Sequence, residues 1–300
     1  APARLVYDPP PTRDDMEDSS RKQPVAEALG KLTAGAQREI LIESAYFILG
    51  DDALAEARRL TTQGVRIRAL TNSLASNDLV TNHSGYARRR AAMLESGLEL
   101  YELRPDAAAC QRLITGSTGS AGCAGGRSFG LHSKSVVLDR KIVYVGSFNV
   151  NLRSTYLNSE TALIIDSPVL AEQIAASIEE LMAPDSSWQV VRTPSGQLEW
   201  RSETDGKLVV ETREPMTGFW RRFNSGFYGL FPWRSTSDPG RPERPESGVP
   251  VCPDFVLHFA PLWPSITTPT AEARPKNQPT KDRHHHATQA SQAWLVTAEG

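Results

Sequence analysis

The sequence predicts an α/β protein with a mixed β-sheet flanked by helices, and three observations support this class. Over the first 184 residues, short apolar runs alternate with amphipathic stretches that end at glycine. The resulting order of strand, helix, strand, helix, strand is typical of α/β folds. The chain has 300 residues and is 39% hydrophobic and 23% charged, which is enough apolar material for a sizeable core.

The first half of the chain supplies four expected strands and two expected helices. Asp51 is a plausible N-cap of one helix, which stops at Gly64, and the other helix covers 85–97. The strands are expected at 3–8, 39–48, 65–72 and 98–103.

The second half continues with apolar runs at 135–139 and 141–147, separated by a tight turn at Arg140 and Lys141. A further run at 160–166 leads into a helix with Ser167 as its N-cap and Pro168 at its first position. Three strand-like segments between 188 and 211 predict a small β meander, and 218–232 is an aromatic, mildly basic amphipathic segment.

Two stretches are not expected to form regular structure. The segment 110–129 is a Gly/Ser-rich loop, and 233–300 is a Pro-rich tail that we expect to be disordered, since it holds ten of the 21 prolines. Three histidines in the tail, at 284–286, are interpreted as incidental rather than as metal ligands.

Charge and cysteine content exclude several classes. The net charge is −2, so nucleic acid is not an expected partner and any phosphate recognition must be local. Cys110, Cys123 and Cys252 lack metal-ligand spacing, which argues against a zinc site or a disulfide framework and favours a reducing compartment. No apolar run is long enough to span a bilayer, so the chain is expected to be soluble. It lacks an initiator Met and is interpreted as a processed or excised piece.

The strongest signal is "HSKSVVLDRKIVYVGSFN", which begins at His132. His132 and Lys134 are two residues apart, so on an extended strand their side chains share one face of the sheet. An imidazole can attack a phosphodiester when the negative oxygens are neutralised, and Lys134 supplies the positive charge. The stretch therefore predicts a phosphate site that contains a nucleophile. Its defining positions are His132, Lys134, Asp139, Gly146, Ser147 and Asn149.

The other positions of the stretch complete this site. The hydroxyl of Ser147 and the amide of Asn149 are expected to donate hydrogen bonds to phosphate, and Gly146 allows close approach of the backbone. A carboxylate is needed to orient the imidazole, as in a catalytic triad. Glu160 is favoured for this task. Asp139 is the alternative, although its place at the turn favours a structural role. A lone histidine on a strand usually packs in the core or lies on the surface without a function. Only the combined spacing of the six defining positions favours a functional role for His132.

These residues match the HxK(x)4D(x)6GSxN signature of the phospholipase D superfamily, the HKD motif. The longer strings "VGSFNVNLRSTYLNSE", "LTNSLASNDLVTNHSGYARRR" and "GLELYEL" resemble the second half of bacterial cardiolipin synthases of the C type. The resemblance runs from about residue 4 to 232, and departs where Asn151 and Leu152 replace the Asp and Pro that relatives often carry. The tail after 232 resembles nothing in these relatives, as a frameshift or fusion would produce.

The resemblance implies a phosphatidyltransferase that acts on a phosphatidylglycerol-like phospholipid through a phosphohistidine, without cofactor or metal. The implied catalytic residues are His132, Lys134, Asp139 and Glu160, and the implied phosphate-binding residues are Lys134, Gly146, Ser147 and Asn149. It also implies a division into a phospholipase D-like catalytic half-domain (1–184), the meander with the aromatic segment (185–232) and the tail (233–300).

Family members carry two HKD motifs, whereas no second HxK precedes His132 in this chain. His83 has no lysine two residues later, so a packing or substrate-channel role is expected for it. The second motif is therefore expected from a missing N-terminal segment or from a homodimer. A homodimeric phosphodiesterase or nuclease and an inactive phosphodiester-binding fragment remain as alternatives.

The expected location is cytoplasmic, with peripheral contact to the inner face of a bacterial membrane. The aromatic segment either inserts Trp220, Phe223 and Phe227 into a membrane interface or caps the core with them.

Overall fold

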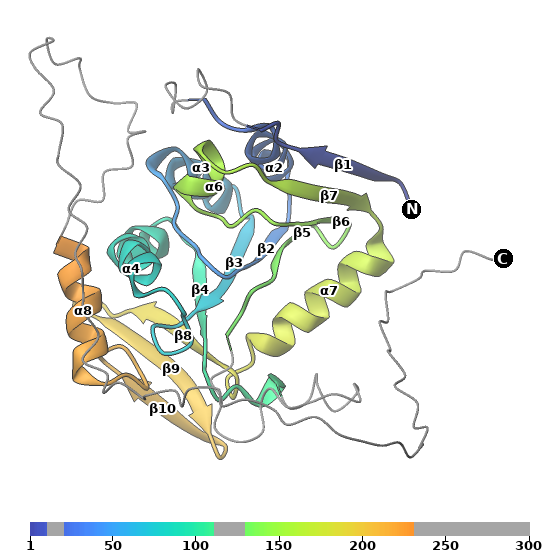
Figure 1. Cartoon of the computed structure of the whole chain (residues 1–300). Helices are drawn as coiled ribbons and strands as arrows, with labels where there is room; N and C mark the ends of the chain where they lie inside the picture. The colour runs from blue at the N-terminus through green and yellow to red at the C-terminus, as the bar shows by residue number, and fades with distance from the viewer. Residues whose placement is uncertain (11–20, 111–129, 231–300) are drawn as a thin grey trace, which may run out of the picture. The chain divides into compact units, whose positions relative to one another are not determined.

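The computed structural model describes residues 1–10, 21–110 and 130–230, which form a mixed sheet with helices on both faces (Figure 1). The sheet has ten strands in the order β1-β7-β6-β5-β2-β3-β4-β8-β9-β10. This confirms the predicted fold class. The strands are β1 (Ala3–Tyr7), β2 (Glu39–Ser44), β3 (Arg66–Asn72), β4 (Glu99–Leu103), β5 (Lys134–Leu138), β6 (Ile142–Gly146), β7 (Thr161–Asp166), β8 (Ser187–Arg192), β9 (Leu198–Thr204) and β10 (Lys207–Glu211).

Two of the described helices, α6 and α7, begin at a residue whose side chain caps the helix. The Ser167 side chain accepts a hydrogen bond from the Leu170 N–H at the start of α7, as the sequence predicts. Gly64 adopts a φ of +91° after α3, a conformation that glycine tolerates without strain. The described helices are α2 (Pro24–Ala34), α3 (Asp51–Thr62), α4 (Val80–Glu95), α6 (Leu152–Tyr156), α7 (Pro168–Leu181) and α8 (Phe219–Leu230).

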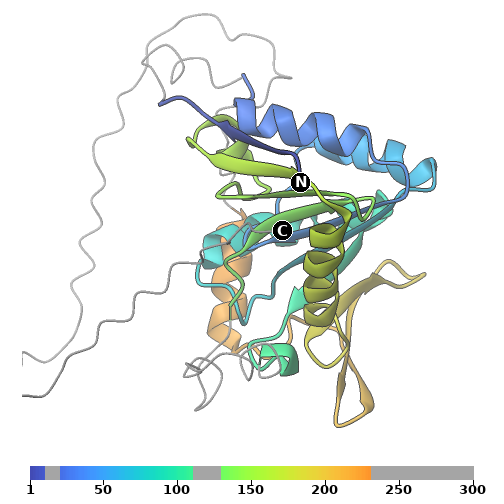
Figure 2. The ribbon, with the colours of Figure 1, turned by 90° about the vertical axis from the view of Figure 1, so that its right-hand side faces the viewer.

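The two faces of the sheet build two separate cores. Alternate residues of each strand point to opposite faces, and α7 covers one face while α2, α3 and α4 cover the other (Figures 1 and 2). Toward α7 lie Leu41, Leu70, Leu103 and Val137. Toward the other helices lie Ile40, Ile42, Ala69, Leu100, Val136 and Ile164.

The directions of the strands bring the ends of several strands together at one end of the sheet. Strands β2, β3 and β4 run parallel, while β5 is antiparallel to β2 and Lys134 pairs with Ser44. In the next two pairs, β6 runs antiparallel to both β5 and β7. The carboxyl ends of β2, β3 and β6 therefore lie beside the amino ends of β5 and β7. The HKD residues other than Asp139 belong to this end, which we call the site edge.

Several boundaries differ from the prediction. Gly50 rather than Asp51 is the N-cap of α3, and α4 begins at Val80, five residues before the predicted start. The β5–β6 turn is centred on Asp139 and Arg140, whose φ angles are +51° and +55°, and not on Arg140 and Lys141. Two positive φ angles suit the right-handed twist of a two-residue hairpin.

The meander and α2 show what tertiary contacts add. The predicted meander exists as β8, β9 and β10, but it extends the main sheet through the β4–β8 pair. Helix α2 was not anticipated, since its N-cap residue Gln23 makes no side-chain cap. Its buried face, which includes Val25 and Leu29, packs against the core beneath β1 and β7.

At the end of the sheet opposite the site edge, Asp139 holds the start of β2. Its carboxylate accepts hydrogen bonds from the backbone N–H groups of Gln37 (2.9 Å), Arg38 (2.8 Å) and Glu39 (3.0 Å). Burial raises the pKa of Asp139, but these hydrogen bonds outweigh burial and hold it below its ordinary value. Asp139 lies about 16 Å along β5 from Lys134, so these contacts are structural. A direct part for it in the chemistry stays a prediction.

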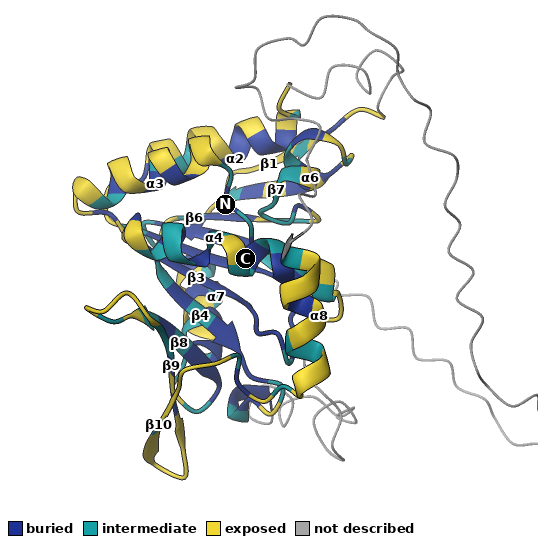
Figure 3. Cartoon of the chain, turned by 90° about the vertical axis from the view of Figure 1, so that its left-hand side faces the viewer, coloured by how far each residue is buried: buried dark blue, intermediate teal, exposed yellow. Residues whose placement is uncertain are grey.

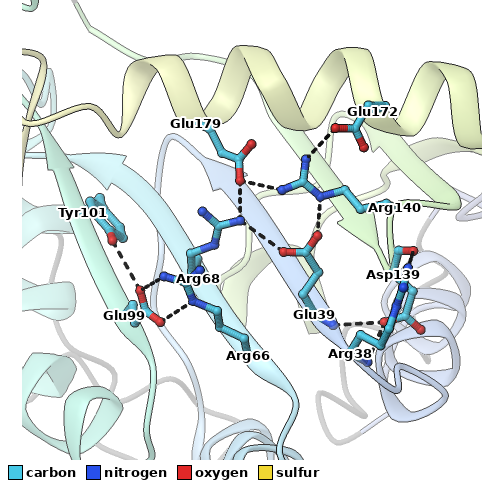
Figure 4. A network of polar contacts seen from close by, with 10 residues as sticks. All are labelled: Arg38, Glu39, Arg66, Arg68, Glu99, Tyr101, Asp139, Arg140, Glu172 and Glu179. Carbon is cyan, nitrogen blue, oxygen red and sulfur yellow. Dashed lines mark hydrogen bonds and ion pairs between the residues drawn. The ribbon is translucent and has the colours of Figure 1, made fainter.

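The same end carries an ion-pair network that joins α7 to the sheet (Figure 4). Arg68 contacts Glu39 (3.1 Å) and Glu179 (2.6 Å), and Arg140 bridges the same two carboxylates. Glu179 belongs to α7, whereas Glu39 and Arg68 belong to β2 and β3. The network fixes the helix over the strands that position the site edge.

Some expectations fall outside the described residues, namely those for most of the Gly/Ser-rich loop, for Cys123 and Cys252, and for the tail with its three histidines. Cys110 is disulfide-bonded, which corrects the inference from cysteine spacing that argued against disulfides and favoured a reducing compartment. A disulfide requires proximity in the folded chain, and sequence spacing does not report it. Within the described part of the chain, no helix is long and apolar enough to cross a membrane.

Candidate active site

His132 and Lys134 stand at the start of β5, on the site edge. His132 is exposed and lies two residues before Lys134, which is half-buried and is the first residue of the strand. Lys134 has the same strand parity as Val136 and Leu138, which point toward α2, α3 and α4. Its ammonium group donates a hydrogen bond to the His132 backbone oxygen. The cation therefore lies next to the imidazole-bearing residue.

The backbone just before His132 is held by a buried amide. Asn72, at the end of β3, donates from Nδ2 to the Leu131 carbonyl oxygen (3.0 Å) and accepts at Oδ1 from the Leu131 N–H (2.8 Å). Its Nδ2 also lies 3.2 Å from the Ala45 carbonyl oxygen beyond β2. The side chain thus replaces a missing β-ladder rung and fixes where His132 leaves the sheet.

The last residue of β6, Gly146, must be glycine for a steric reason. A Cβ placed on Gly146 would lie 2.1 Å from the Thr161 carbonyl oxygen and 2.7 Å from the Ala162 Cα. Such contacts are impossible without movement of the backbone. The close approach continues where the Ser147 N–H donates to the same Thr161 oxygen (2.9 Å). Gly146 therefore sets the position of Ser147 relative to β7.

Glu160, the residue before β7, is buried beside Ser147. Its carboxylate accepts hydrogen bonds from the Ser147 hydroxyl and from Asn158 Nδ2 (3.0 Å), and its N–H donates to Asp8 Oδ2 (3.0 Å). Among the described residues, the His132 ring makes no hydrogen bond to Glu160. The role of Glu160 in orienting the imidazole therefore stays a prediction, as does phosphate binding by the Ser147 hydroxyl, which here donates to the carboxylate.

Asn149 is the site residue with an unused polar atom. Its Oδ1 is buried and accepts no hydrogen bond within the described residues. The next turn begins at Asn151, whose side chain accepts from the Ser154 N–H (2.8 Å) and caps α6. The Asn151 departure from the family pattern therefore keeps a capping oxygen. The unpaired Asn149 atom is an acceptor, so donation from the Asn149 amide nitrogen to phosphate stays a prediction.

Lys134 is electrostatically coupled to two carboxylates. Desolvation lowers its pKa, while the charges of Glu160 and Asp78 act in the opposite direction, and the pKa stays below its ordinary value. Asp78 is exposed and accepts hydrogen bonds from the Tyr46 hydroxyl (2.8 and 3.0 Å). Burial, together with this carboxylate, raises the pKa of Tyr46 to about 12. Tyr46 and Asp78 thus add a hydroxyl and a carboxylate to the site edge.

His83 does not belong to the site edge. Its ring is fully buried and lies 3.3 Å from Glu214 Oε1 and 3.2 Å from an Arg90 nitrogen. The expected packing role for His83 agrees with this burial. Within the described ranges, no group of three or more His, Cys, Asp or Glu side chains is placed to hold a metal ion.

Sequence reasoning missed four residues of this site, namely Asp8, Tyr46, Asn72 and Asp78. Each acts across a large sequence separation, and no local spacing rule finds such contacts. The only available signal was that Tyr46 and Asn72 are polar residues near the carboxyl ends of two predicted strands, where sites of α/β proteins commonly lie.

Removing the Asp78 carboxylate is expected to lower the pKa of Lys134. In the variant Asp78→Asn, the ammonium loses a negative neighbour, so it deprotonates at lower pH. If protonated Lys134 is required, the alkaline limb of the kcat/KM profile shifts to lower pH. The matched control is Asp52→Asn, which removes another exposed carboxylate; Asp52 lies on α3 and pairs with Lys22. An alkaline limb that stays in place in Asp78→Asn would contradict this coupling.

The fold and the site edge define a class of protein. In this class a histidine and a lysine lie at one end of a mixed sheet, beside a strand that ends in a glycine packed closely against the next strand. This is the architecture of phospholipase D-like proteins. A family model described as "Cardiolipin synthase, PLD-like domain" matches residues 30–182. The chain is 34% identical over 223 residues to cardiolipin synthase C of Escherichia coli (strain K12). It therefore belongs to the phospholipase D superfamily and to the cardiolipin synthase-like group within it.

Further comparisons give the extent of the similarity. The match to cardiolipin synthase C covers 74% of this chain and 45% of that protein. An uncharacterized protein of Helicobacter pylori is 28% identical over 217 residues, 72% of this chain and 41% of that one. The phosphatidylserine synthase structure of Haemophilus influenzae Rd KW20 matches with a TM-score of 0.45 at 15% identity, over 62% of this chain and 39% of that chain. The chain thus spans less than half the length of these relatives.

Proposed function

We propose that this chain is one half of a phosphatidyltransferase of the cardiolipin synthase type, which acts on phospholipid phosphodiesters through a phosphohistidine at His132. The observation that carries the proposal is the position of Lys134 beside His132 on the site edge. The superfamily is one of phosphodiesterases and phosphatidyltransferases, and the cardiolipin synthase-like match favours the second activity.

In the proposed first step, an unprotonated ring nitrogen of His132 attacks the phosphorus of the donor lipid. A P–N bond forms, the P–O bond to the headgroup breaks, and the leaving oxygen takes a proton from the histidine of a second HKD motif. Lys134 and Asn149 stabilise the phosphoryl oxygens as their negative charge increases. Glu160 orients the His132 ring in this proposal, which is supported by the action of its charge on the neighbouring Lys134.

In the second step, the acceptor hydroxyl attacks the same phosphorus. The second histidine takes its proton, the P–N bond breaks, and His132 leaves unprotonated. Transfer results when the acceptor is a lipid alcohol, and hydrolysis results when it is water. Each step uses side chains alone, so chelators are expected to leave the rate unchanged.

The second histidine is supplied by a segment absent from this sequence or by a second copy of the chain. The donor is expected to be phosphatidylglycerol or a similar lipid, reached by peripheral contact with a bacterial membrane. The disulfide at Cys110 favours an oxidising compartment and therefore argues against the expected cytoplasmic location.

The deciding experiment measures headgroup release and transfer from phosphatidylglycerol vesicles over a range of concentrations of the purified chain. Pairing of two copies predicts a specific activity that rises with concentration. A half-enzyme predicts turnover only when the preceding half of a two-motif relative is added. Absence of turnover in both arms, with the chain folded by circular dichroism, would contradict the proposal and favour a binding fragment.

A further inference from the structure

Helix α8 carries a row of large aromatic side chains on its outer face. Phe219, Trp220 and Phe223 are 66%, 72% and 50% exposed. Their rings contact one another, with centroids 5.6 to 6.2 Å apart. Figure 3 shows the exposed residues along α8. Phe227 is also 45% exposed, and these exposures favour the first of the two alternatives for Trp220, Phe223 and Phe227 over capping of the core.

The opposite face fixes α8 to the protein body. Ser225 is 8% exposed, and its carbonyl oxygen accepts a hydrogen bond from the Ser84 hydroxyl of α4 (2.8 Å). Just before the helix, Glu214 forms an ion pair with the buried Arg90 (2.9 Å). The exposed aromatic rings therefore belong to an anchored helix, and their exposure does not arise from a loose end.

The N-terminal part of α8 also lies against the site edge. The guanidinium group of Arg221 donates to the carbonyl oxygens of Leu74 (2.8 Å) and Asn77. These two residues belong to the loop between β3 and α4. The next residue of that loop is Asp78, whose charge acts on Lys134. The aromatic row therefore starts beside the loop that borders the candidate phosphate site.

Charge and composition indicate which surface these rings meet. The only charged side chains of α8 are Arg221 and Arg222, and the helix contains no Asp or Glu. A helix with Phe and Trp on one face and arginine beside them is typical of segments that lie in the interface of an anionic bilayer. A phospholipid substrate also resides in a bilayer, so a docking surface continuous with the site shortens the path of the headgroup to Lys134.

We propose that the outer face of α8, formed by Phe219, Trp220 and Phe223, docks on an anionic phospholipid surface and orients the site edge toward the lipid headgroups. The proposal rests on the proposed function for the meaning of this orientation. The docking itself is a binding property, and it is measured without any turnover.

The test is flotation of the purified full chain with vesicles of phosphatidylglycerol and phosphatidylcholine, and with vesicles of phosphatidylcholine alone. The variant Trp220→Ser with Phe223→Ser is compared with Val169→Ser with Leu208→Ser, which removes two side chains of similar exposure (72% and 68%) from α7 and β10. Circular dichroism and thermal unfolding check that both are folded. The single variants Trp220→Ser and Phe223→Ser provide the same readout if the double variant unfolds.

The wild-type chain is expected to float with the anionic vesicles and less with the neutral ones. The α8 double variant should partition at least about tenfold less, because two exposed aromatic groups no longer bury apolar area in the interface, and the α7/β10 control should match wild type. His132→Ala should also float like wild type. If that holds while the wild-type chain transfers no phosphatidyl group, either alone or with an added N-terminal half, the proposed function fails and the docking proposal stands.

Three results would overturn the docking proposal. The wild-type chain could fail to float with anionic vesicles, or the α8 double variant could float as well as the control. Alternatively, light scattering without lipid could show that wild type self-associates and the α8 variant does not, with equal flotation of both. This last result would assign the aromatic row to contact between copies of the chain.

Discussion

Replacing His132 by alanine is expected to lower phosphatidyl transfer by at least about 10³-fold, because removal of a nucleophile eliminates the covalent pathway. No other described side chain of the site edge replaces it. Lys134 is a cation, and the Ser147 hydroxyl donates to the Glu160 carboxylate. The assay uses phosphatidylglycerol vesicles and whichever form of the protein turns over, the chain alone or the chain with an added N-terminal half.

The matched control for this loss is Ser133→Ala. Ser133 is exposed and lies between His132 and Lys134, so strand alternation directs its side chain to the other face. Wild-type protein incubated with labelled lipid should also retain an acid-labile, base-stable label, as a phosphoramidate does, and His132→Ala should not. A His132→Ala variant with wild-type turnover would rule out the phosphohistidine at this position.

Replacing Arg90 by methionine is expected to lower the free energy of unfolding by about 3–5 kcal/mol, because it removes the cation of a buried ion pair and leaves the carboxylate partner buried without a counter-charge. Arg90 is 2% exposed and contacts Glu102, which is fully buried, at 3.0 Å. Its guanidinium also lies over the rings of Tyr86 and Trp200, 4.8 and 4.9 Å from their centroids. Burial lowers the pKa of Arg90, but the negative charges of Glu102 and Glu214 raise this pKa by more and keep the guanidinium group protonated.

The pH dependence of the variant has a definite sign. Burial raises the pKa of Glu102 even with Arg90 present, and loss of the cation removes the main opposing influence. A carboxyl group whose pKa is higher in the folded than in the unfolded protein is destabilising as pH rises through the interval between the two values. The Arg90→Met variant should therefore regain stability as the pH falls toward the range where Glu102 is protonated.

Urea unfolding followed by circular dichroism measures this effect. The control is Arg89→Met on the same helix, whose side chain is more exposed, bonds the Leu49 carbonyl oxygen and pairs with the exposed Asp51, and whose loss should cost about 1 kcal/mol. The double variant Arg90→Met with Glu102→Gln should recover part of the stability lost in Arg90→Met. Equal losses in Arg90→Met and Arg89→Met would show that the buried network contributes little.

The sequence by itself determined the class of fold and the location of the motif. Apolar periodicity and capping residues such as Ser167 are local properties, so strands and helices followed from neighbouring residues alone. The spacing of His132, Lys134, Gly146 and Asn149 is likewise local, because one hairpin carries all four. This is why the proposed nucleophile and its cation were identified without coordinates.

The tertiary structure alone decided how that hairpin is held and what surrounds it. Asn72 fixes Leu131 from 59 residues away, and Asp8 supports Glu160 from 152 residues away. Such contacts arise when strands distant in sequence pair, and no periodicity reports them. The same holds for the burial of Arg90 and the exposure of Trp220. A residue is buried only when another element covers it, and the sequence of its own helix does not contain that information.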